Sequence, residues 1–236
     1  MAASTDVAVE PKARILDAAA DAFMRHGFAD TTVDDIADAV GATKGLIYYH
    51  YRSKFDIFLA VYEQGMQRVR KRVEPLVIGP GSGRERLESM SVAHVVNLMN
   101  DLSYHHVVHQ GVRDQESTAL KARQRDALIA LNELRRDYEV LFRDVVADGV
   151  ADGSLRNIDV VLATRVLLSS LNAVDVWYRK SDGQAGENHS ELARAVVDLV
   201  IQGVAANTPS PTGTANKPRT ERASRAATRH ADTAHR

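Results

Sequence analysis

The sequence predicts an all-α fold of about nine helices, and three observations support this class. Apolar residues recur at helical spacing through most of the chain. No segment shows strict apolar–polar alternation bounded by hairpin turns, so strands are not expected. The six prolines lie mainly at expected helix ends or in the last segment of the chain. With 44% apolar and 26% charged residues, the 236-residue chain can bury a globular core.

The first helix is expected over residues 11–26, after a flexible segment of residues 1–10. Pro11 suits a first helical turn, where its missing N–H has no helical partner to lose. Apolar residues then follow one stripe at helical spacing. Gly27 can take the left-handed conformation that ends many helices, so the helix is predicted to stop there.

The second helix is expected to begin after Thr31 or Thr32 and to end at Gly41. Each threonine precedes an aspartate by three residues, a variant of the capping box. Thr43 can cap a short third helix over residues 44–51. Two short helices joined by a glycine-containing turn are therefore predicted.

The rest of the chain is expected to form longer helices. Ser53 caps one that stops near Pro75, and a Gly/Pro-rich break over residues 79–83 follows. Because the segment 158–178 is apolar on most faces, we expect it to be buried or to lie at an interface. Residues 207–236 carry six Lys/Arg and two acidic residues, net +4, with no large apolar side chain, and are predicted to be a disordered basic tail. The expected helices are 84–108, 119–150, 158–178 and 191–204, with 111–118 as a short helix or loop.

Composition limits the compartment and the chemistry. Cysteine is absent, so disulfides, thiolate metal sites and a cysteine nucleophile are excluded. The N-terminus lacks the basic and apolar regions of a signal peptide. The longest uncharged apolar run in the C-terminal half, residues 166–174, is shorter than the about 20 residues of a spanning helix. We expect a cytoplasmic protein that is not inserted in a membrane.

The pair of short helices between residues 31 and 54 has the plan of a helix-turn-helix, whose second helix enters the major groove of DNA. Lys44 lies in the first turn of that helix, where it can donate to guanine O6 and N7. The net charge of the chain is −1, but residues 39–55 hold Lys44, Arg52 and Lys54 without an acid. This local positive charge can contact phosphates. The candidate DNA-contacting residues are Thr32, Thr43, Lys44, Gly45, Tyr48, Tyr49, His50 and Lys54.

The same region resembles the DNA-binding domain of the tetracycline-repressor (TetR/AcrR) family over about residues 11–60. The usual phenylalanine of the pattern is Tyr51 here. The resemblance implies a helix-turn-helix domain over residues 11–60, a ligand-binding and dimerisation domain over residues 61–206, and a homodimer on palindromic double-stranded operator DNA. The residues that carry it, in this spacing, are Phe23, Gly27, Phe28, Thr31, Thr32, Ile36, Ala37, Gly41, Thr43, Gly45, Tyr48, His50, Tyr51 and Lys54.

The C-terminal half offers candidate ligand-binding residues. Polar side chains interrupt the apolar stripe of the helix 84–108, as in apolar pockets that hold a few placed polar groups. Each could equally lie on a solvated face or be a satisfied core residue. The candidate pocket residues are His94, Asn97, Asp101, Asn172 and Trp177.

Three histidines raise a metal-sensing alternative. His105 and His109 lie one turn apart, with His106 beside them and Asp101 a further turn back. Zinc requires three or four ligands in tetrahedral order. Nothing else in the sequence indicates a metal, so neither a metal site nor a cofactor is expected.

A second resemblance suggests the class of effector. The segment 138–179 is similar to the C-terminal domains of family members that respond to acyl-CoA or steroid-derived CoA thioesters. It implies a CoA thioester effector and control of lipid or sterol catabolism. The same motif also fits a helix turn and buried packing, so it can mark architecture instead of ligand. The residues concerned are Phe142, Gly149, Gly153, Leu155, Arg156, Asp159, Trp177, Tyr178 and Arg179.

Dimerisation is expected through the helices 158–178 and 191–204, which would form a four-helix bundle with their symmetry mates. The expected mechanism is repression relieved by a small-molecule effector, with activation as an alternative. The candidate interface residues are Leu167, Leu168, Leu171, Val196, Leu199 and Val200.

Two other classes of protein were weighed. An enzyme is not expected, because Ser82 and Ser154 lie in glycine-flanked loops without a strand-turn-helix nucleophile elbow, and no glycine-rich phosphate loop is present. A non-specific DNA-packaging protein would use the basic tail as its main anchor. The tail can also be an inert extension. Deletion of residues 207–236 and replacement of Lys44 distinguish a packaging protein from a sequence-specific regulator by their effects on DNA affinity and specificity.

Overall fold

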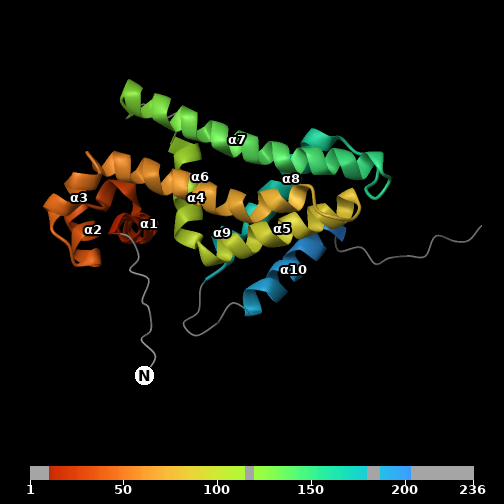
Figure 1. The fold of residues 1–236 in the computed structure, drawn as a ribbon, viewed down its shortest axis with the longest axis horizontal. Helices are drawn as coiled ribbons and strands as arrows, with labels where there is room; N and C mark the ends of the chain where they lie inside the picture. Colours follow the sequence, from red (N-terminus) through yellow and green to blue (C-terminus); the bar gives the residue numbers. More distant parts are fainter. Residues whose placement is uncertain (1–10, 115–119, 180–186, 203–236) are drawn as a thin grey trace, which may run out of the picture. The chain divides into compact units, whose positions relative to one another are not determined.

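The computed structural model describes residues 11–114, 120–179 and 187–202, in which all regular structure is helical (Figure 1). The prediction of an all-α fold is confirmed. The segments predicted to be a flexible N-terminus and a basic tail lie outside the described residues. The helices are α1 (Pro11–Asp30), α2 (Val33–Val40), α3 (Lys44–His50), α4 (Lys54–Val77), α5 (Gly83–Asn100), α6 (Leu102–Asp114), α7 (Ala122–Ala151), α8 (Val160–Asn172), α9 (Val174–Trp177) and α10 (Glu187–Gln202).

Two predicted helices are each divided in the structure. The segment 84–108 is broken at Asp101, which leaves helical geometry with φ −115° and ψ 41° and separates α5 from α6. The segment 158–178 is broken at Ala173, which separates α8 from the single turn of α9. Both breaks were missed because neither position carries a glycine or a proline. The chain direction therefore changes at the two points where polar side chains gather.

Local signals start and stop α2 and α3 as expected, whereas α1 continues past its predicted stop at Gly27 to Asp30. Gly27 has φ 78°, a left-handed conformation that favours glycine, and it kinks α1 before its last residues. The Thr32 hydroxyl and the Asp35 carboxylate form a complete capping box at the start of α2. The backbone N–H of Thr32 donates to that carboxylate, and this bond lowers the pKa of Asp35. Gly41 ends α2 with φ 65°, and Thr43 caps α3.

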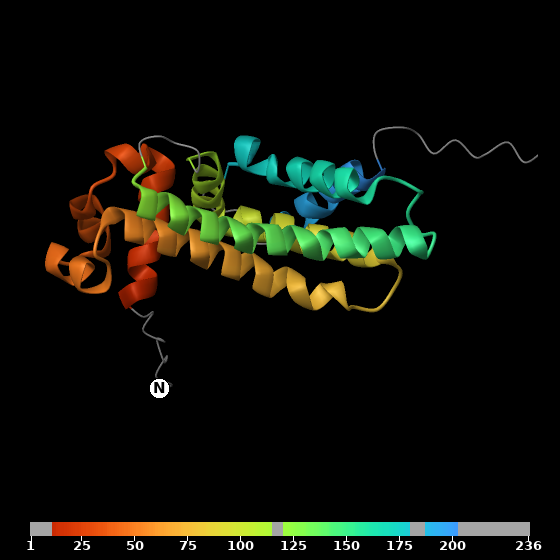
Figure 2. The same ribbon diagram turned by 90° about the horizontal axis from the view of Figure 1, so that it is seen from above.

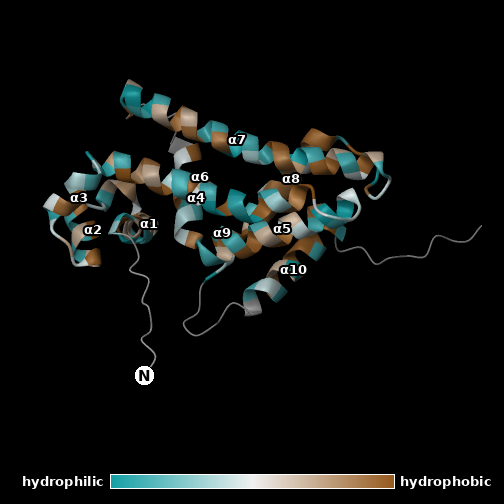
Figure 3. Cartoon of the chain, viewed as in Figure 1, coloured by the Kyte–Doolittle hydropathy of each residue, from teal (hydrophilic) through white to brown (hydrophobic). Residues whose placement is uncertain are grey.

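Helix α4 connects the first three helices to the rest of the structure. It begins at the N-cap Ser53 and continues without a break past residue 60, where the sequence places a domain boundary. It contacts α1 at one end and α5, α6 and α7 further along. Figure 2 shows α4 running beside α7 along most of its length, with α8 on the other side of α7. Helix α10 packs against α5 and α8. The hydropathy colouring of Figure 3 alternates along α4, α5 and α7, as expected for helices with one buried face.

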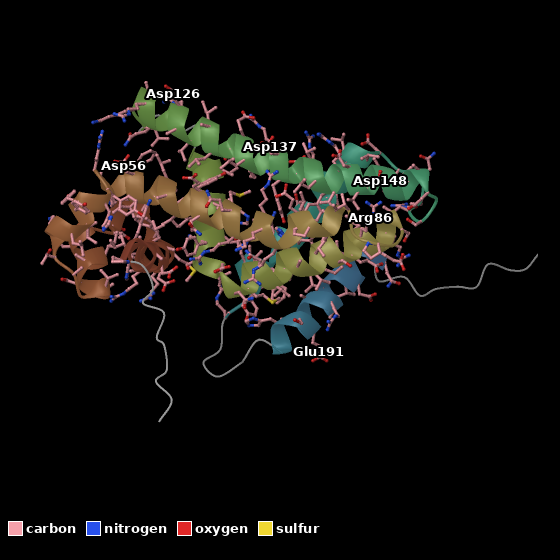
Figure 4. The ribbon with its side chains drawn as sticks, in the orientation of Figure 1. Asp56, Arg86, Asp126, Asp137, Asp148 and Glu191 are labelled. Carbon is pink, nitrogen blue, oxygen red and sulfur yellow. The ribbon has the colours of Figure 1, made fainter. Side chains whose placement is uncertain are left out.

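The start of α5 packs unusually tightly against the end of α7. A Cβ atom on Gly83 would lie 2.2 Å from the backbone nitrogen of Gly149, so the two backbones approach to a distance only glycine permits. The Gly83 N–H donates to Asp152, and an ion pair of 3.0 Å joins Arg86 to Asp148 at the same junction (Figure 4). These bonds fix the end of the structure farthest from α3.

The two serines considered for an enzyme both have structural roles at this junction. Ser82 caps α5 in a capping box with Glu85. The Ser154 hydroxyl accepts a hydrogen bond of 3.0 Å from the backbone N–H of Arg84. Both hydroxyls therefore serve the backbone of the α5 N-terminus.

Replacing Tyr51 with phenylalanine is expected to stabilise the protein. Tyr51 is 7% exposed, and its hydroxyl has no hydrogen-bond partner among the described residues. Burial raises the pKa of Tyr51 to about 12. Removing an unsatisfied buried hydroxyl should raise the free energy of unfolding by about 1 kcal/mol, measurable by urea denaturation.

Tyr62 provides the matched control. Its buried hydroxyl donates a hydrogen bond of 2.6 Å to Asn132. Tyr62→Phe should therefore lower the free energy of unfolding by about 1 kcal/mol. If both variants lose stability equally, the Tyr51 hydroxyl has an acceptor and the explanation is wrong.

Candidate DNA-binding and effector sites

Helix α3 presents most of its side chains to solvent. Ile47 is fully buried and anchors α3, which contacts α2, whereas Lys44, Tyr48 and Tyr49 are exposed, Tyr49 to 83%. His50 is half-buried, and its ring lies 5.1 Å from that of Tyr49. An anchored helix with exposed donors on its outer face can enter a DNA groove without rearranging the core.

Lys44 is held by an acidic neighbour on α2. Its Nζ lies 2.7 Å from Oδ2 of Asp34, with both side chains more than half exposed. The bond to Asp34 raises the pKa of Lys44, so the ammonium is charged. Among the described residues, the bond to Asp34 uses one of the three donors of this ammonium, so a DNA base or phosphate can bind beside Asp34. Thr32, Thr43 and Gly45 are also exposed near this pair.

Lys54 does not fit its predicted role as a phosphate contact. Its Nζ donates to the backbone oxygens of Phe28, Ala29 and Thr31 at 2.6, 3.0 and 2.6 Å. It also lies 4.6 Å from the centre of the Phe28 ring. An ammonium has three donors, and all three are used here. Lys54 therefore fastens the start of α4 to the end of α1, and we correct the prediction.

A cavity of about 510 Å³ lies among α4, α5, α6, α7 and α8. It contains two of the five predicted pocket residues, His94 and Asn172. Its walls combine apolar side chains with an unusual number of polar ones. The lining residues are Met66, Val69, His94, His105, Val108, His109, Val112, Arg135, Tyr138, Glu139, Arg165, Leu168, Ser169 and Asn172.

The other three predicted pocket residues lie elsewhere, and these predictions are corrected. Asn97 is fully buried behind the cavity wall, where its Nδ2 lies 3.1 Å from Nε2 of His105. Asp101 pairs with Arg68 at 2.8 Å outside the cavity. Trp177 is 53% exposed on α9. Helical spacing alone could not place them, because α5 ends at Asp101 and α8 ends before Trp177.

The inner wall of the cavity is polar and uncharged. Nδ1 of His94 lies 2.9 Å from the Tyr138 hydroxyl, and Nε2 lies 3.1 Å from Oδ1 of Asn172. Burial lowers the pKa of His94 to about 4 and lowers the pKa of His105 well below its usual value. Both imidazoles are therefore neutral at physiological pH, and burial likewise raises the pKa of the Tyr138 phenol.

The solvent side of the cavity is charged. Arg135 and Arg165 flank Glu139 at 3.9 and 4.0 Å, distances too long for good hydrogen bonds. The Nε atom of Arg135 is buried and has no hydrogen-bond partner among the described residues. A guanidinium with unused donors at a cavity mouth can bind a carboxylate or phosphate.

The histidines of the metal-sensing alternative separate into different interactions. His105 faces Asn97, whereas Nδ1 of His109 donates to Asp175 at 2.6 Å. His106 makes a contact of its own and does not line the cavity. No group of three or more His, Asp or Glu side chains able to hold a metal ion occurs in the part of the chain that the structure describes.

A polar cluster joins α1 to the helices around the cavity. Arg68 of α4 pairs with Asp17 of α1 at 3.0 Å and with Asp101 at 2.8 Å. The Tyr104 hydroxyl of α6 donates to Asp17 at 2.7 Å, and the Arg68 guanidinium lies 4.0 Å from the Tyr104 ring centre. Helices α4 and α6 also line the cavity, so this Arg68 cluster is in a position to transmit their movement to α1.

The predicted dimer residues divide into two groups. Leu167 and Leu171 are buried within the subunit and Leu168 lines the cavity, so these three are corrected as interface candidates. Leu199 is 56% exposed on α10, with Val196 and Val200 half-buried beside it. The sequence pattern identified α8 as apolar but not which side faces inward.

Another set of apolar side chains is exposed on the same two helices. Leu162 and Val166 of α8 are 61% and 56% exposed, and Leu192 of α10 is also exposed. The window Val160–Trp177 has a mean hydropathy of 1.4 with 22% of it buried, so by length and composition alone it could cross a membrane. It is, however, interrupted at Ala173. Such an exposed apolar face needs a covering partner.

Comparison with known families identifies the chain. Residues 15–61 match the model for bacterial regulatory proteins of the tetR family, and residues 80–204 match the tetracyclin repressor-like C-terminal domain. The chain belongs to the TetR family. As a TetR-family protein it is a DNA-binding transcriptional regulator, and the resemblance noted in residues 11–60 is confirmed.

Individual TetR-family relatives cover most of the chain. The HTH-type transcriptional repressor KstR2 of Rhodococcus jostii (strain RHA1) is 29% identical over 82% of this chain and 91% of its own. The crystal structure of PfmR from Thermus thermophilus is 28% identical with a TM-score of 0.68, covering 82% of this chain and all of that one (100%). FadR from Bacillus subtilis, solved in complex with stearoyl-CoA, is 21% identical with a TM-score of 0.62 over 82% of this chain and 99% of its own, and shows the shared fold.

Sequence reasoning missed most of the TetR-family cavity wall. Arg135, Tyr138 and Glu139 come from one side of α7, which reads as a solvated or core helix when taken alone. His105 is one of the polar residues on the stripe of the helix 84–108 and a possible metal ligand, but it is not among the candidate pocket residues. Its signal was present, because a histidine on an apolar face of a helix needs a polar partner or a ligand.

Proposed function

We propose that this protein is a repressor that binds a palindromic operator as a homodimer and releases it when a CoA thioester enters the cavity. The observation that carries the proposal is an anchored α3 with an exposed, charged Lys44 in its first turn. Residues 11–60 would form the DNA-binding domain and residues 61–206 the ligand-binding and dimerisation domain. Such a regulator would act in the cytoplasm, where bacterial operators are.

Lys44 is proposed to read a base edge, with Thr32, Thr43, Gly45, Tyr48, Tyr49 and His50 positioning the helix on the backbone. A lysine in the first turn of a recognition helix reaches guanine acceptors. The 2.7 Å bond to Asp34 supports this role, because it holds the ammonium beside α3 instead of letting it range over solvent. Lys54 is left out of the proposed contacts.

Lys44→Ala is expected to relax discrimination at one operator position by about 1–3 kcal/mol. The measurement is a competition assay with an operator and its single-base variants at fixed salt. Arg52→Ala is the matched control, because Arg52 is exposed beside α3 but lies outside the helix. It should weaken binding to all sequences equally and reduce the salt slope by about 0.9.

The DNA-packaging alternative predicts the opposite pattern. In that case deletion of residues 207–236 would abolish binding, and Lys44→Ala would change nothing. Under the proposal, the deletion leaves the preference for the operator over its variants intact.

Dimerisation is proposed through the exposed apolar face of α8 and α10, formed by Leu162, Val166, Leu192 and Leu199, with Val196 and Val200 at its edge. Leu162 and Val166 are one turn apart, so a symmetry-related α8 could pack along the stripe. A second copy supplies a self-complementary apolar surface, which an isologous interface requires.

The cavity is proposed as the effector site. Its volume of about 510 Å³ falls within the ordinary range of ligand pockets. Arg135 and Arg165 at its solvent side suit the phosphates of CoA, with the acyl group directed inward. Stearoyl-CoA in the FadR structure is in keeping with this class of ligand.

A thermal-shift screen on the full chain tests the effector class against free fatty acids and zinc. Binding to the folded dimer must raise the melting temperature. The proposal predicts a shift with a CoA thioester and loss of operator binding at the same concentrations. A shift with zinc alone would favour a metal sensor instead.

A further inference from the structure

We infer that the cavity selects acyl groups carrying a ketone or hydroxyl oxygen at the end remote from the CoA, in preference to plain alkyl chains. This inference rests on the proposed function, because it takes the cavity to be the effector site. The observation behind it is that the buried wall has hydrogen-bond donors without acceptors. The hydrogen bonds of His94, His105 and Asn172 show which atoms these donors are.

The hydrogen bonds of His94 fix its proton. Oδ1 of Asn172 can only accept, so Nε2 of His94, 3.1 Å away, carries the proton and donates. Nδ1 is then a lone pair and accepts from the Tyr138 hydroxyl at 2.9 Å. The imidazole is fully used. The Nδ2 amide of Asn172 has no hydrogen bond among the described residues, although Asn172 lines the cavity.

His105 gives a second donor by the same reasoning. The Asn97 amide nitrogen can only donate, so Nε2 of His105, 3.1 Å away, accepts. Because His105 is neutral, its single proton lies on Nδ1, and no hydrogen bond of that atom is seen within the described ranges. The His94 and His105 rings are 5.8 Å apart and nearly perpendicular, so the two donors belong to one wall.

These two donors have no acceptor among the described residues, and the unpaired acceptor behind them, Oδ1 of Asn97, belongs to a buried residue that does not line the cavity, so a ligand could supply the missing acceptor. An alkyl chain seated there would displace water from the Asn172 amide and the His105 N–H and leave both unsatisfied. A ketone oxygen has two lone pairs and a hydroxyl oxygen also accepts, so either can satisfy this wall. Sites that hydrogen-bond a ligand oxygen discriminate strongly against the analogue without it.

A neutral oxygen fits this wall better than a carboxylate. His94, His105 and Tyr138 are all at most 6% exposed, and no charged side chain of the described residues bonds to any of them. A buried anion without a paired cation is costly. The nearby arginines, Arg135 and Arg165, are the more exposed side chains of the cavity and suit the anionic end of the same ligand.

The test compares octanoyl-CoA with 7-oxooctanoyl-CoA and 7-hydroxyoctanoyl-CoA by isothermal titration calorimetry on the full chain. The three free acids are titrated in parallel. The two oxygenated ligands are expected to bind about tenfold more tightly or better, the difference that an unsatisfied buried donor makes. Equal or tighter binding of the octanoyl ligand in the series that binds, or no binding in either series, overturns the inference.

Two variants show which side chain is responsible. Asn172→Leu removes the donor while keeping the size, so it should abolish the preference for oxygen. Ser170→Ala is the control, since the Ser170 hydroxyl donates to the Val166 carbonyl oxygen within α8 and Ser170 does not line the cavity. It should retain the preference. If Asn172→Leu does not fold, His105→Phe serves the same comparison. The comparison of the three ligands on the wild-type protein tests the inference without either variant.

The two proposals fail in different ways. If the thioesters do not bind but the free acids show the preference for oxygen, the CoA class is wrong and the inference stands. If the thioesters bind and release the operator without any preference for oxygen, the proposed function stands and the inference is wrong.

Discussion

Gly83→Ala is expected to cost about 3 kcal/mol or more of folding stability, a very large effect for a single added methyl group. The new Cβ would lie 2.2 Å from the nitrogen and 2.4 Å from the Cα of Gly149. Backbone atoms cannot swing aside as a flexible side chain can. Helices α5 and α7 would therefore have to separate along their contact.

The separation would also break the polar bonds at this junction. The Gly83 N–H donates to Asp152 at 2.7 Å, and Arg86 pairs with Asp148 at 3.0 Å. These bonds join residues that are 62 to 69 positions apart in the sequence, so their loss removes contacts between distant parts of the chain. Urea denaturation followed by circular dichroism at 222 nm measures the loss in the free energy of unfolding. The m-value should stay close to that of the wild type, because unfolding exposes about as much protein surface in both proteins.

Gly45→Ala is the matched control, since it makes the same change on a helix where the nearest heavy atom outside the local backbone is 3.8 Å from the new Cβ. There alanine should be neutral or stabilising by up to about 1 kcal/mol, because it is the better helix former. If Gly83→Ala unfolds at the same urea concentration as the wild type, α5 and α7 can move apart freely, and the close packing described is wrong.

Val166→Glu is expected to convert the proposed dimer to monomers and to reduce operator affinity more than a hundredfold. Val166 is 56% exposed on the subunit, so the substitution should leave the monomer folded. In a two-fold interface the change introduces two carboxylates, each losing water without a cation to pair with. A monomer offers only one recognition helix, so the advantage of binding two half-sites together is lost.

Sedimentation velocity and operator titration measure the two effects on one preparation. Ile78→Glu carries the same charge change at a side chain that is 89% exposed in the turn between α4 and α5. This variant should remain dimeric and bind the operator normally. If Val166→Glu stays dimeric with unchanged affinity, the subunits meet on another surface.

The sequence predicted the helix-turn-helix well because its signals are local. The Thr32–Asp35 capping box and the Ser53–Asp56 cap each act over three residues, and Gly41 acts through its own φ. Such features are visible in a short window of sequence. They fix the ends of α2 and α4 whatever the rest of the chain does.

Most errors about the roles of single residues concern contacts over long stretches of sequence. Lys54 looked free because its acceptors, Phe28 to Thr31, lie 23 to 26 residues earlier. Asp101 looked like a pocket residue because its partner Arg68 is 33 residues away on α4. Leu167 and Leu171 looked like interface residues because periodicity identifies an apolar face without saying which neighbour covers it.

The Arg68 cluster has a consequence for how the protein reports its ligand. It ties α1 to both α4 and α6, so under the proposed function ligand binding in the cavity and the position of α1 would be energetically coupled. Thermodynamic linkage then runs both ways: by whatever factor the effector weakens the hold on DNA, the operator must weaken the hold on the effector. Repressor bound to its operator would thus have a lower affinity for the effector than free repressor. Genes with stronger operators would respond at higher effector concentrations.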